Sequence, residues 1–577
     1  MKHNKIKISV SLLQMFLAMK KLAIGEDDFK LLRQGNNYFV DKSLFIEDVI
    51  NDASRVLLFP RPRRFGKTLN MSMLYYFFSN KNVEENRRLF DGLAITKSPV
   101  FEQHQGQYPV ISLSFKSCKG DSYEKIYYSI RSVIGKAFKE HKFILEKDKF
   151  YQTELEKFNS IIEEKADESL LSESVLLLSE FLHRYYQKKV FILIDEYDTP
   201  VHEAYLNGFY TQAIDFLRTL LGNTLKGNQH LQKGILTGIL RVSKESMFSD
   251  LNNVKVYSVL SDKFNTWFGF TQREVDQFLN DFGLGMLRNE VKDWYNGYYF
   301  GNEEIYNPWS ILCFADSNGE FKPYWLSTSA NALVHSLIKN SDKTVKKDIE
   351  DGMNNIPVYS TIDENISFDF LKNSRGHILS FLVQTGYLKA RYHDFVGSDR
   401  IYQIEIPNIE LSKIYYTVIE TWFNESIGSK ELDDMLNALI ANDIKTFERI
   451  LSKFVLETLS YFNVGRRTKE VERVFQAFLL GMLIRLKDRY EVYSEKESGY
   501  GRFDVSVIPK DKSKQAIIME LKSIDTFNSE TKDQTLDAAL QQIEDRQYEA
   551  TLRQQGCTNI MKVAVTFDGK RVWAKTR

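Results

Sequence analysis

The first part of the chain alternates short apolar runs with longer segments whose apolar residues recur at helical spacing. The apolar runs lie at 56–59, 109–115, 190–195 and 234–240. They are nearly continuous in apolar residues, which is typical of strands buried on both faces of a parallel sheet. Because helical patterns separate the runs, we predict an α/β fold around a parallel sheet.

The pattern changes between about residues 285 and 460, where aromatic-rich motifs precede mostly helical segments. WYNGYYFG (294–301) and YNPWSIL (306–312) belong to this middle region. They could form a lid near a ligand site or pack the interface between domains, and we favour packing. Residues 377–392 show a helix, a Gly turn and a strand, which is the order in a winged-helix module. The middle region is therefore predicted to be mostly helical, with a winged helix as one form of it.

A third pattern begins near residue 462. A long amphipathic helix at 471–490 precedes three strand candidates, a second helix at 536–555 and a final strand at 560–567. The three strand candidates cover 490–495, 501–509 and 515–523. The order α-β-β-β-α-β is sufficient for a compact domain, so we predict a separate C-terminal α/β domain.

Composition fits a folded protein of several domains. The 577 residues include 43% hydrophobic and 27% charged residues, which excludes predominant disorder. Lys and Arg balance Asp and Glu at 77 each, which excludes a globally basic nucleic-acid binder but not a local basic groove. No apolar run reaches the ~20 residues of a membrane-spanning helix. The three cysteines, Cys118, Cys313 and Cys557, are far apart and indicate a reducing, cytoplasmic location.

A basic loop follows the first strand candidate and precedes an aromatic-rich helix. It runs from Arg61 to Thr68 and matches the phosphate-binding pattern G-x-x-x-x-G-K-[ST], except that Arg61 replaces the first Gly. Backbone N–H groups of such a loop cradle the phosphates of ATP, while Lys67 would reach the β- and γ-phosphates and Thr68 would hold Mg²⁺. The predicted nucleotide-binding residues are Arg64, Phe65, Gly66, Lys67 and Thr68.

The strand candidate at 190–195 ends in Asp195 and is followed by Glu196. Asp195 would bind Mg²⁺ through water, and Glu196 would orient or deprotonate the attacking water. Ligands bind at the carboxyl ends of parallel strands, so this motif and the basic loop together predict an ATP site. The simpler interpretation is a basic surface turn beside a capped strand.

Further residues near this site are open to two interpretations. Thr237, in the fourth apolar run, is either a sensor of the γ-phosphate or an ordinary buried threonine. Arg63, Arg64 and Arg241 are candidate cations for the transition state, although each also fits a solvated basic loop.

The C-terminal domain contains two carboxylates and a lysine at a spacing that suits a metal-dependent phosphodiesterase. Asp504 lies on one strand candidate, and Glu520 and Lys522 share one face of the next. The two carboxylates and the Leu521 carbonyl are hard oxygen ligands for Mg²⁺ or Mn²⁺. Lys522 would position a metal-bound water or neutralise developing charge, and Gln542 on the following helix could reach the same point. A surface ion pair is the simpler alternative.

Residues 19–577 resemble the AAA-ATPase-like family of bacterial proteins, which join a P-loop module to a PD-(D/E)XK nuclease-superfamily domain. The motifs that carry the resemblance include RPRRFGKTL (61–69), LIDEYDTP (193–200), WYNGYYFG, YNPWSIL, QTGYLKA, IPN (406–408), SGYGRFDV and MELK. The resemblance implies Lys67, Thr68, Asp195 and Glu196 as the nucleotide site. It implies Asp504, Glu520 and Lys522 as the nuclease triad, with Gln542 as an accessory.

Four parts are therefore expected: an extension or mis-assigned start at 1–18, an ATPase domain at 19–284, the middle region at 285–461 and a nuclease-like domain at 462–577. The first function hypothesis is an ATPase that gates a metal-dependent nuclease, with DNA favoured over RNA on family analogy alone. The second is an ATPase switch whose C-terminal domain binds nucleic acid without cleaving it. A scaffold with a degenerate loop is a third. No membrane partner is expected, and a homo-oligomer stays open because P-loop ATPases often assemble so that a neighbour supplies an arginine.

Overall fold

The computed structural model describes residues 20–146, 150–241, 253–327, 343–353, 356–365, 374–415, 429–458, 489–494, 504–524, 530–568 and 571–577, with isolated residues between these ranges. The chain divides into two compact units. The first contains Met1–Asn340 and Pro357–Ser412, and the second contains Ser341–Ile356 and Lys413–Arg577. Each unit has its own central sheet, and each is described by itself.

A parallel sheet of five strands forms the centre of the first unit. The strands are β1 (Val56–Pro60), β2 (Val110–Ser114), β3 (Val190–Asp195), β4 (Leu231–Gly238) and β5 (Val254–Val256), in the order β2-β3-β4-β1-β5. All neighbouring pairs run parallel. The predicted parallel sheet is confirmed, and β5 is an edge strand that the apolar runs did not indicate.

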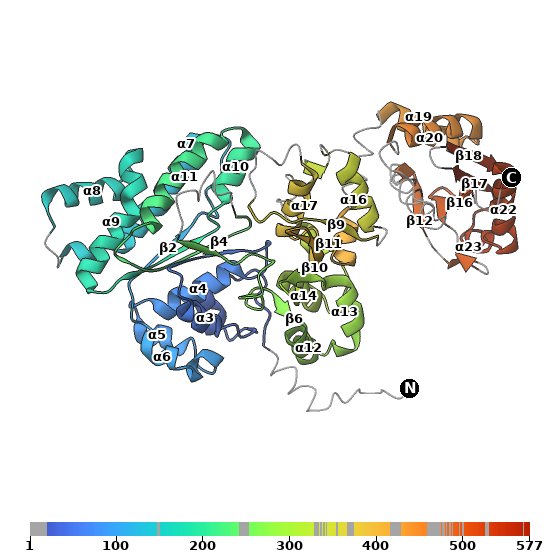
Figure 1. Ribbon diagram of the computed structural model, residues 1–577. Coiled ribbons are helices and arrows are strands. Elements are labelled where there is room, and N and C mark those ends of the chain that lie inside the picture. The colour runs from blue at the N-terminus through green and yellow to red at the C-terminus, as the bar shows by residue number, and fades with distance from the viewer. Residues whose placement is uncertain are drawn as a thin grey trace, which may run out of the picture. The chain divides into compact units, whose positions relative to one another are not determined.

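Helices cover both faces of this sheet (Figure 1). On one face lie α7 (Tyr123–Glu140), α9 (Glu168–Tyr186) and α11 (Tyr210–Leu225), and on the other lie α3 (Phe45–Asn51) and α4 (Lys67–Phe78). The other helices of this part are α2 (Phe29–Gln34), α5 (Val83–Arg88), α6 (Pro99–His104), α8 (Gln152–Ile162) and α10 (Thr199–Asn207). The double cover explains why every residue of β1 and β3 is buried.

The local sequence of α7 explains both its start and its orientation. The Ser122 hydroxyl accepts a hydrogen bond from the Lys125 N–H and so caps the first turn. Ile126, Ile130 and Ile134 are buried at intervals of four residues, which places them on one face of the helix. That apolar face packs toward the core, and the polar residues between them remain at the surface.

The rest of the first unit combines helices with two small antiparallel sheets. Its helices are α12 (Gln272–Asp281), α13 (Arg288–Tyr295), α14 (Pro308–Asp316) and α17 (Arg375–Gln384). One sheet contains β6 (Phe270–Thr271), β7 (Tyr298–Phe300) and β8 (Glu303–Tyr306), in the order β6-β8-β7. The other contains β9 (Val358–Ser360), β10 (Lys389–Val396) and β11 (Asp399–Glu405), in the order β10-β11-β9. The predicted helix, Gly turn and strand appear as α17, Gly386 and β10.

Gly269 packs against the loop that follows β1, and we predict that Gly269→Ala destabilises the first unit. Its φ is +86°, and an added Cβ would lie 2.3 Å from Ile305 Cγ2 and 2.8 Å from Phe65 Cδ1. Backbone strain and overpacking together should lower the free energy of unfolding by about 3 kcal/mol. Thermal unfolding measures the loss. Gly283→Ala is the matched control, because Gly283 has φ +70° and open space around its Cβ position. Equal losses in the two variants would mean that the close contacts carry no cost.

The second unit contains a mixed sheet of five strands in the order β12-β15-β16-β17-β18. The strands are β12 (Tyr490–Ser494), β15 (Val505–Pro509), β16 (Ala516–Ser523), β17 (Ile560–Asp568) and β18 (Arg571–Thr576). Strands β16 and β17 run parallel, and the other neighbours run antiparallel. The first and third predicted strands and the final strand are confirmed. The second, predicted over 501–509, is divided into β14 (Gly501–Arg502) and β15, and Asp504 lies just before β15 rather than on a strand. β18 extends the sheet at its edge.

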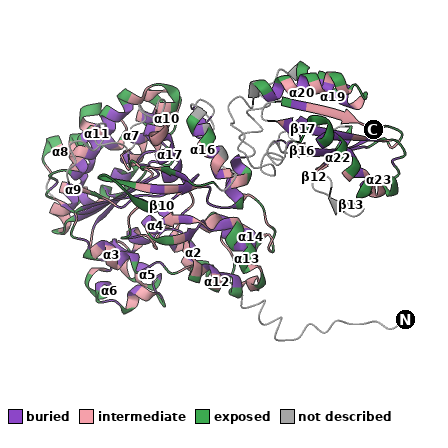
Figure 2. Ribbon diagram, turned by 45° about the vertical axis from the view of Figure 1, so that its right-hand side comes forward, coloured by how far each residue is buried: buried purple, intermediate pink, exposed green. Residues whose placement is uncertain are grey.

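Two hydrophobic cores lie on opposite faces of this sheet. One contains residues of α19 (Ser429–Ile440) and α20 (Ile444–Thr458), and the other contains residues of α22 (Lys532–Asp545) and α23 (Glu549–Gln554). Figure 2 shows the buried strands β16 and β17 beside helices with exposed outer faces. The remaining elements are α16 (Lys343–Met353) and a hairpin of β13 (Glu497–Ser498) and β14 (Gly501–Arg502). The helix predicted over 471–490 falls largely outside the described residues.

Candidate functional sites

The basic loop connects the end of β1 to the start of α4. Gly66 has φ +81° and caps the helix, and Arg64 also has a left-handed φ of +67°. These two residues turn the chain so that α4 begins at Lys67. A helix N-terminus presents unpaired N–H groups and a partial positive charge, and both favour a bound phosphate.

The side chains predicted for the nucleotide site meet at the ends of β1, β3 and β4. Lys67 Nζ donates to the carbonyl oxygens of Arg61 and Pro62, each at 3.1 Å, and lies 3.4 Å from Glu196 Oε1. The Thr68 hydroxyl donates to Asp195 Oδ2 at 2.8 Å. This is the arrangement that the sheet topology implies, because parallel strands end at one edge.

Thr237, whose role was open, donates its hydroxyl to Asp195 Oδ1. Asp195 is therefore held between two hydroxyl groups, from α4 and from β4. Thr237 is fully buried, so the structure accounts for it as a partner of Asp195 as well as a core residue.

The pKa values of Asp195, which ends β3, and of Glu196, which follows it, are shifted in opposite directions. Burial raises the pKa of Asp195, and the negative charge of Glu196 raises it further. Burial also acts to raise the pKa of Glu196, but the positive charges of Lys67 and Arg63 outweigh it and hold that pKa below its usual value. Glu196 is therefore the better candidate for a charged base at neutral pH.

Arg61, in the place of the first Gly of the loop pattern, is completely buried and turns away from the phosphate position. Its guanidinium donates to the carbonyl oxygens of Pro60, Tyr257 and Phe264, at 2.9, 2.5 and 3.2 Å. It also lies 5.0 Å from the ring of Phe268. Burial lowers the pKa of Arg61 to about 9. Arg61 is thus a brace that ties the loop to the segment after β5.

The other arginines considered from the sequence take different places. Arg63 and Arg64 line the cavity beside the loop, and Arg241 does not. The Arg64 guanidinium stacks on the Trp309 ring, 3.7 Å from its centre, and burial lowers the pKa of Arg64. Of the three arginines, Arg63 and Arg64 therefore lie beside the cavity, and Arg64 is already engaged with Trp309.

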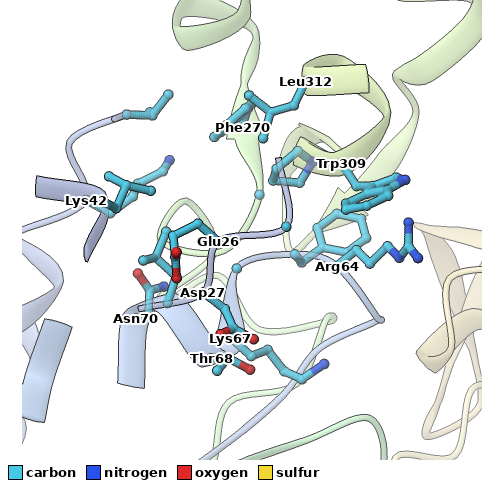
Figure 3. A pocket seen from close by; sticks show the side chains of 18 of the residues that line it. Glu26, Asp27, Lys42, Arg64, Lys67, Thr68, Asn70, Phe270, Trp309 and Leu312 are labelled. Atoms are coloured by element: carbon cyan, nitrogen blue, oxygen red, sulfur yellow. The ribbon is translucent and has the colours of Figure 1, made fainter. Parts of the chain in front are cut away.

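A cavity of about 450 Å³ opens beside the loop, within the first unit (Figure 3). Its lining includes the loop from Arg63 to Asn70, residues 23–42 of the N-terminal segment and Trp309 of α14. A volume of this size is typical of small-molecule sites. The described part of the chain thus has a cavity beside its predicted phosphate loop.

The two aromatic motifs of the middle region differ in their contacts. Tyr298 and Phe300, from WYNGYYFG, pack against the ring of Phe65 at 5.0 and 5.2 Å. Trp309 and Leu312, from YNPWSIL, line the cavity itself. The packing that we favoured holds for the first motif but is incomplete for the second, which forms one wall of the candidate site.

The motif IPN (406–408) meets WYNGYYFG directly. Asn408 Nδ2 donates to the Asn296 carbonyl oxygen at 2.7 Å. Gly297 has φ +99°, and a Cβ there would lie 2.2 Å from the Pro407 carbonyl oxygen. The sequence gives no chemistry to these motifs because their roles are mutual contacts, which appear only in the folded chain.

Glu410, which the sequence did not single out, is a completely buried acid close to the cavity wall. Ser310 Oγ donates to Glu410 Oε2 at 2.8 Å, and the Trp325 N–H donates to Oε1 at 2.9 Å. Burial raises the pKa of Glu410 to about 7, against a usual value of 4.5. Glu410 therefore links α14 to the segment that follows IPN, and it titrates near neutral pH.

We predict that Glu410 makes the first unit less stable as pH rises. A raised pKa in the folded state contributes stability that is complete below about pH 4.5 and is lost as pH rises through about 7. The full loss should be about 3 kcal/mol. Asp198, whose pKa burial raises to about 6, acts in the same direction, so the informative quantity is the difference between wild type and Glu410→Gln.

Thermal unfolding of wild type and Glu410→Gln between pH 5 and 8 measures that difference. The midpoint of wild type should fall relative to that of the variant as pH rises. Glu303→Gln, at an exposed position, is the control and should follow wild type. Parallel curves for wild type and Glu410→Gln would contradict the prediction.

The carboxylates predicted for the second site lie side by side in the sheet of the second unit. Val505 of β15 pairs with Met519 of β16, which places the preceding Asp504 next to Glu520. Asp504 Oδ2 accepts a hydrogen bond from the Leu521 N–H at 2.7 Å. Glu520 is buried, and Lys522 is half-buried two residues further along the same strand. The three triad residues thus lie at the same end of the neighbouring inner strands β15 and β16.

Gln542 and Tyr548 complete this cluster. Gln542 Nε2, on α22, donates to Glu520 Oε1 and lies 3.4 Å from the Tyr548 hydroxyl. Burial raises the pKa of Tyr548, and the charges of Glu520 and Asp504 add to the increase. Tyr548 is a residue that the sequence reasoning missed. No local pattern signals it, because Tyr548 lies after the end of α22, beyond a turn at Gln547.

The donor set fits a hard divalent cation, although the cluster is small. Asp504 and Glu520 offer carboxylate oxygens, and Leu521, which directly follows Glu520 in the chain, offers a carbonyl oxygen. In the part of the chain that the structure describes, no group of three or more His, Cys, Asp or Glu residues could hold a metal ion. Two carboxylates and a carbonyl are consistent with Mg²⁺, which usually keeps several of its waters.

Comparisons with known proteins match two separate regions of the chain, one around each candidate site. Residues 23–248 match the family model described as a predicted AAA-ATPase, and residues 470–577 match that of the PD-(D/E)XK nuclease superfamily. A protein of Azotobacter chroococcum mcd 1, described as an uncharacterized protein in the vnfD 5′ region, is 24% identical over 551 residues. The match covers 94% of this chain and 95% of that protein. Among the described residues, no helix is both long and apolar enough to cross a membrane.

Proposed function

We propose that this chain, which joins an AAA-ATPase-like domain to a PD-(D/E)XK nuclease-superfamily domain, uses ATP to gate a metal-dependent nuclease. The observation that carries the ATP part is the meeting of Lys67 with Glu196 and of Thr68 with Asp195 at one sheet edge. The predicted domain boundaries, 19–284 and 462–577, are part of this proposal, and the family models match residues 23–248 and 470–577.

In the ATP site, each side chain has a distinct task. Lys67 would leave the carbonyls of Arg61 and Pro62 and bind the β- and γ-phosphates, which are more negative partners. Thr68 and Asp195 would hold Mg²⁺, which neutralises charge on the phosphates. Glu196 would orient the attacking water and accept its proton on the carboxylate, a role that its lowered pKa supports.

In the nuclease site, Asp504, Glu520 and the Leu521 carbonyl would hold Mg²⁺ or Mn²⁺. A metal there supplies an activated water and stabilises charge on the phosphodiester. Gln542 keeps the Glu520 carboxylate oriented through its hydrogen bond. Lys522 would place its ammonium beside the scissile phosphate. A DNA substrate rather than RNA rests on family analogy alone.

The direct test is cleavage of DNA and RNA substrates by the purified full chain in Mg²⁺ or Mn²⁺. The reactions are run without nucleotide, with ATP and with a non-hydrolysable ATP analogue. Cleavage that changes with ATP supports a gated nuclease. Cleavage at the same rate with and without ATP contradicts gating by ATP. ATP turnover without cleavage favours the second hypothesis, an ATPase switch that binds nucleic acid without cleaving it.

A further inference from the structure

Glu196, the residue proposed to activate the attacking water, has an unusual backbone conformation. Its φ is +53°, in the left-handed region that residues with a Cβ seldom adopt. A residue keeps such a conformation only where the surrounding contacts fix it, and these residues cluster at functional sites. The contacts that fix the backbone of Glu196 therefore also set where its carboxylate lies, 3.4 Å from Lys67 Nζ.

The two residues that follow this glutamate are tied to the end of β4. The Tyr197 N–H donates to the Thr237 carbonyl oxygen at 3.1 Å, and the Tyr197 hydroxyl donates to the Leu240 carbonyl oxygen at 2.6 Å. Asp198 Oδ2 accepts from the N–H groups of Ile239 and Leu240, at 2.8 and 2.9 Å. Both side chains are buried. These hydrogen bonds join the chain that follows β3 to the chain that leaves β4.

Gly238, the last residue of β4, leaves the space that this contact needs. A Cβ at Gly238 would lie 2.6 Å from Asp198 Oδ1 and 2.7 Å from Tyr197 Cε1. A larger residue at this position would therefore push both side chains away from the end of β4. The same strand end also holds Asp195, through the Thr237 hydroxyl. The ends of β3 and β4 are thus fixed to each other on both sides of Glu196.

We propose that Asp198 is a positioning residue for ATP hydrolysis, which holds Glu196 where its carboxylate meets the attacking water. The proposal rests on the ATPase function proposed above. Asp198 does not line the cavity and is almost completely buried, so its effect on the reaction passes through Glu196. Such an effect is large, because a misplacement of ~1 Å at a reacting group costs about a hundredfold in rate.

The test is single-turnover hydrolysis by the full chain in Mg²⁺, with enzyme in excess over labelled ATP, beside titration with a non-hydrolysable ATP analogue. Asp198→Ala should slow hydrolysis by about 10- to 100-fold, because it removes the acceptor that holds residues 239 and 240. Its affinity for the analogue should stay within about threefold of wild type, since Lys67 and Thr68 are unchanged. Asp198→Asn should recover most of the rate, because a single oxygen, Oδ2, accepts both hydrogen bonds.

A double variant tests whether Asp198 acts through Glu196. Glu196→Gln removes the carboxylate that would accept the proton and should slow hydrolysis by about a hundredfold or more. Adding Asp198→Ala to it should slow hydrolysis by less than about threefold further, because residues that act as one unit are not additive. Losses that multiply in the double variant would mean that Asp198 acts elsewhere, and would overturn the proposal.

Asn228→Ala separates positioning from a loss of stability. Asn228 is buried just before β4, at the other end of the same strand, and its Oδ1 accepts from the His230 N–H at 2.9 Å. This variant should lower the unfolding midpoint about as much as Asp198→Ala does, yet hydrolyse ATP at the wild-type rate. Equal slowing in the two variants overturns the proposal, as does undiminished hydrolysis in Asp198→Ala. A wild type that hydrolyses no ATP overturns the proposed function instead.

Discussion

Glu520→Gln is expected to reduce metal-dependent cleavage by at least about a hundredfold, the largest effect that the second unit should show. The substitution keeps the size of the side chain but removes the negative charge of one of two carboxylates. Glu520 is almost completely buried and lies beside Asp504. The measurement is the cleavage rate of a labelled substrate as Mg²⁺ is increased.

Two comparisons make this result specific. Asp537→Asn removes a negative charge from the exposed surface of α22, where Asp537 pairs with Lys575 at 2.5 Å, and should cleave as wild type does. Thermal unfolding of Glu520→Gln without metal should show a folded second unit. Cleavage that persists at the wild-type rate in Glu520→Gln would mean that the activity comes from another site.

Lys67→Ala is expected to lower ATP turnover by at least about a hundredfold, because it removes the one predicted phosphate-binding lysine of the loop. Lys67 already holds the carbonyl oxygens of Arg61 and Pro62 and the carboxylate of Glu196. The variant therefore loses a cation for the phosphates and also leaves Glu196 without its nearest positive charge. Phosphate release and ATP titration measure the two consequences separately.

The matched control for this lysine is Lys125→Ala. Lys125 is exposed and pairs with Asp121 at 2.6 Å on the surface of the same unit. It should turn over ATP as wild type does. If Lys67→Ala binds and hydrolyses ATP normally, the loop is not a nucleotide site, and the scaffold hypothesis becomes the better account of the first unit.

The sequence predicts the central strands well because their environment leaves a local signal. Strands β1 and β3 are buried on both faces, so nearly every residue in them is apolar. β5 and β9 have three residues each, which is too short for a pattern to develop. Their strand conformation depends on hydrogen bonds from a neighbouring strand that is distant in sequence. The local sequence alone therefore does not predict these strands.

The residues of the candidate sites also fall into those that the sequence could place and those that it could not. Lys67, Thr68 and Asp195 could be placed together because parallel strands end at one edge of a sheet. Trp309 could not be assigned to the cavity, since its position depends on how a distant segment packs. Tyr548 lies beyond the end of α22, after a turn in which Gln547 has φ +52°. Its approach to Gln542 depends on that turn.

Arg61 limits which substitutions the first position of the loop can accept. In a loop that opens with glycine, the first position is free of side-chain contacts, whereas here it supplies the donor for the carbonyls of Tyr257 and Phe264. A single change to glycine would take that donor away from buried acceptors. A motif search that requires glycine at this position will therefore pass over loops that are braced in this way by a buried arginine.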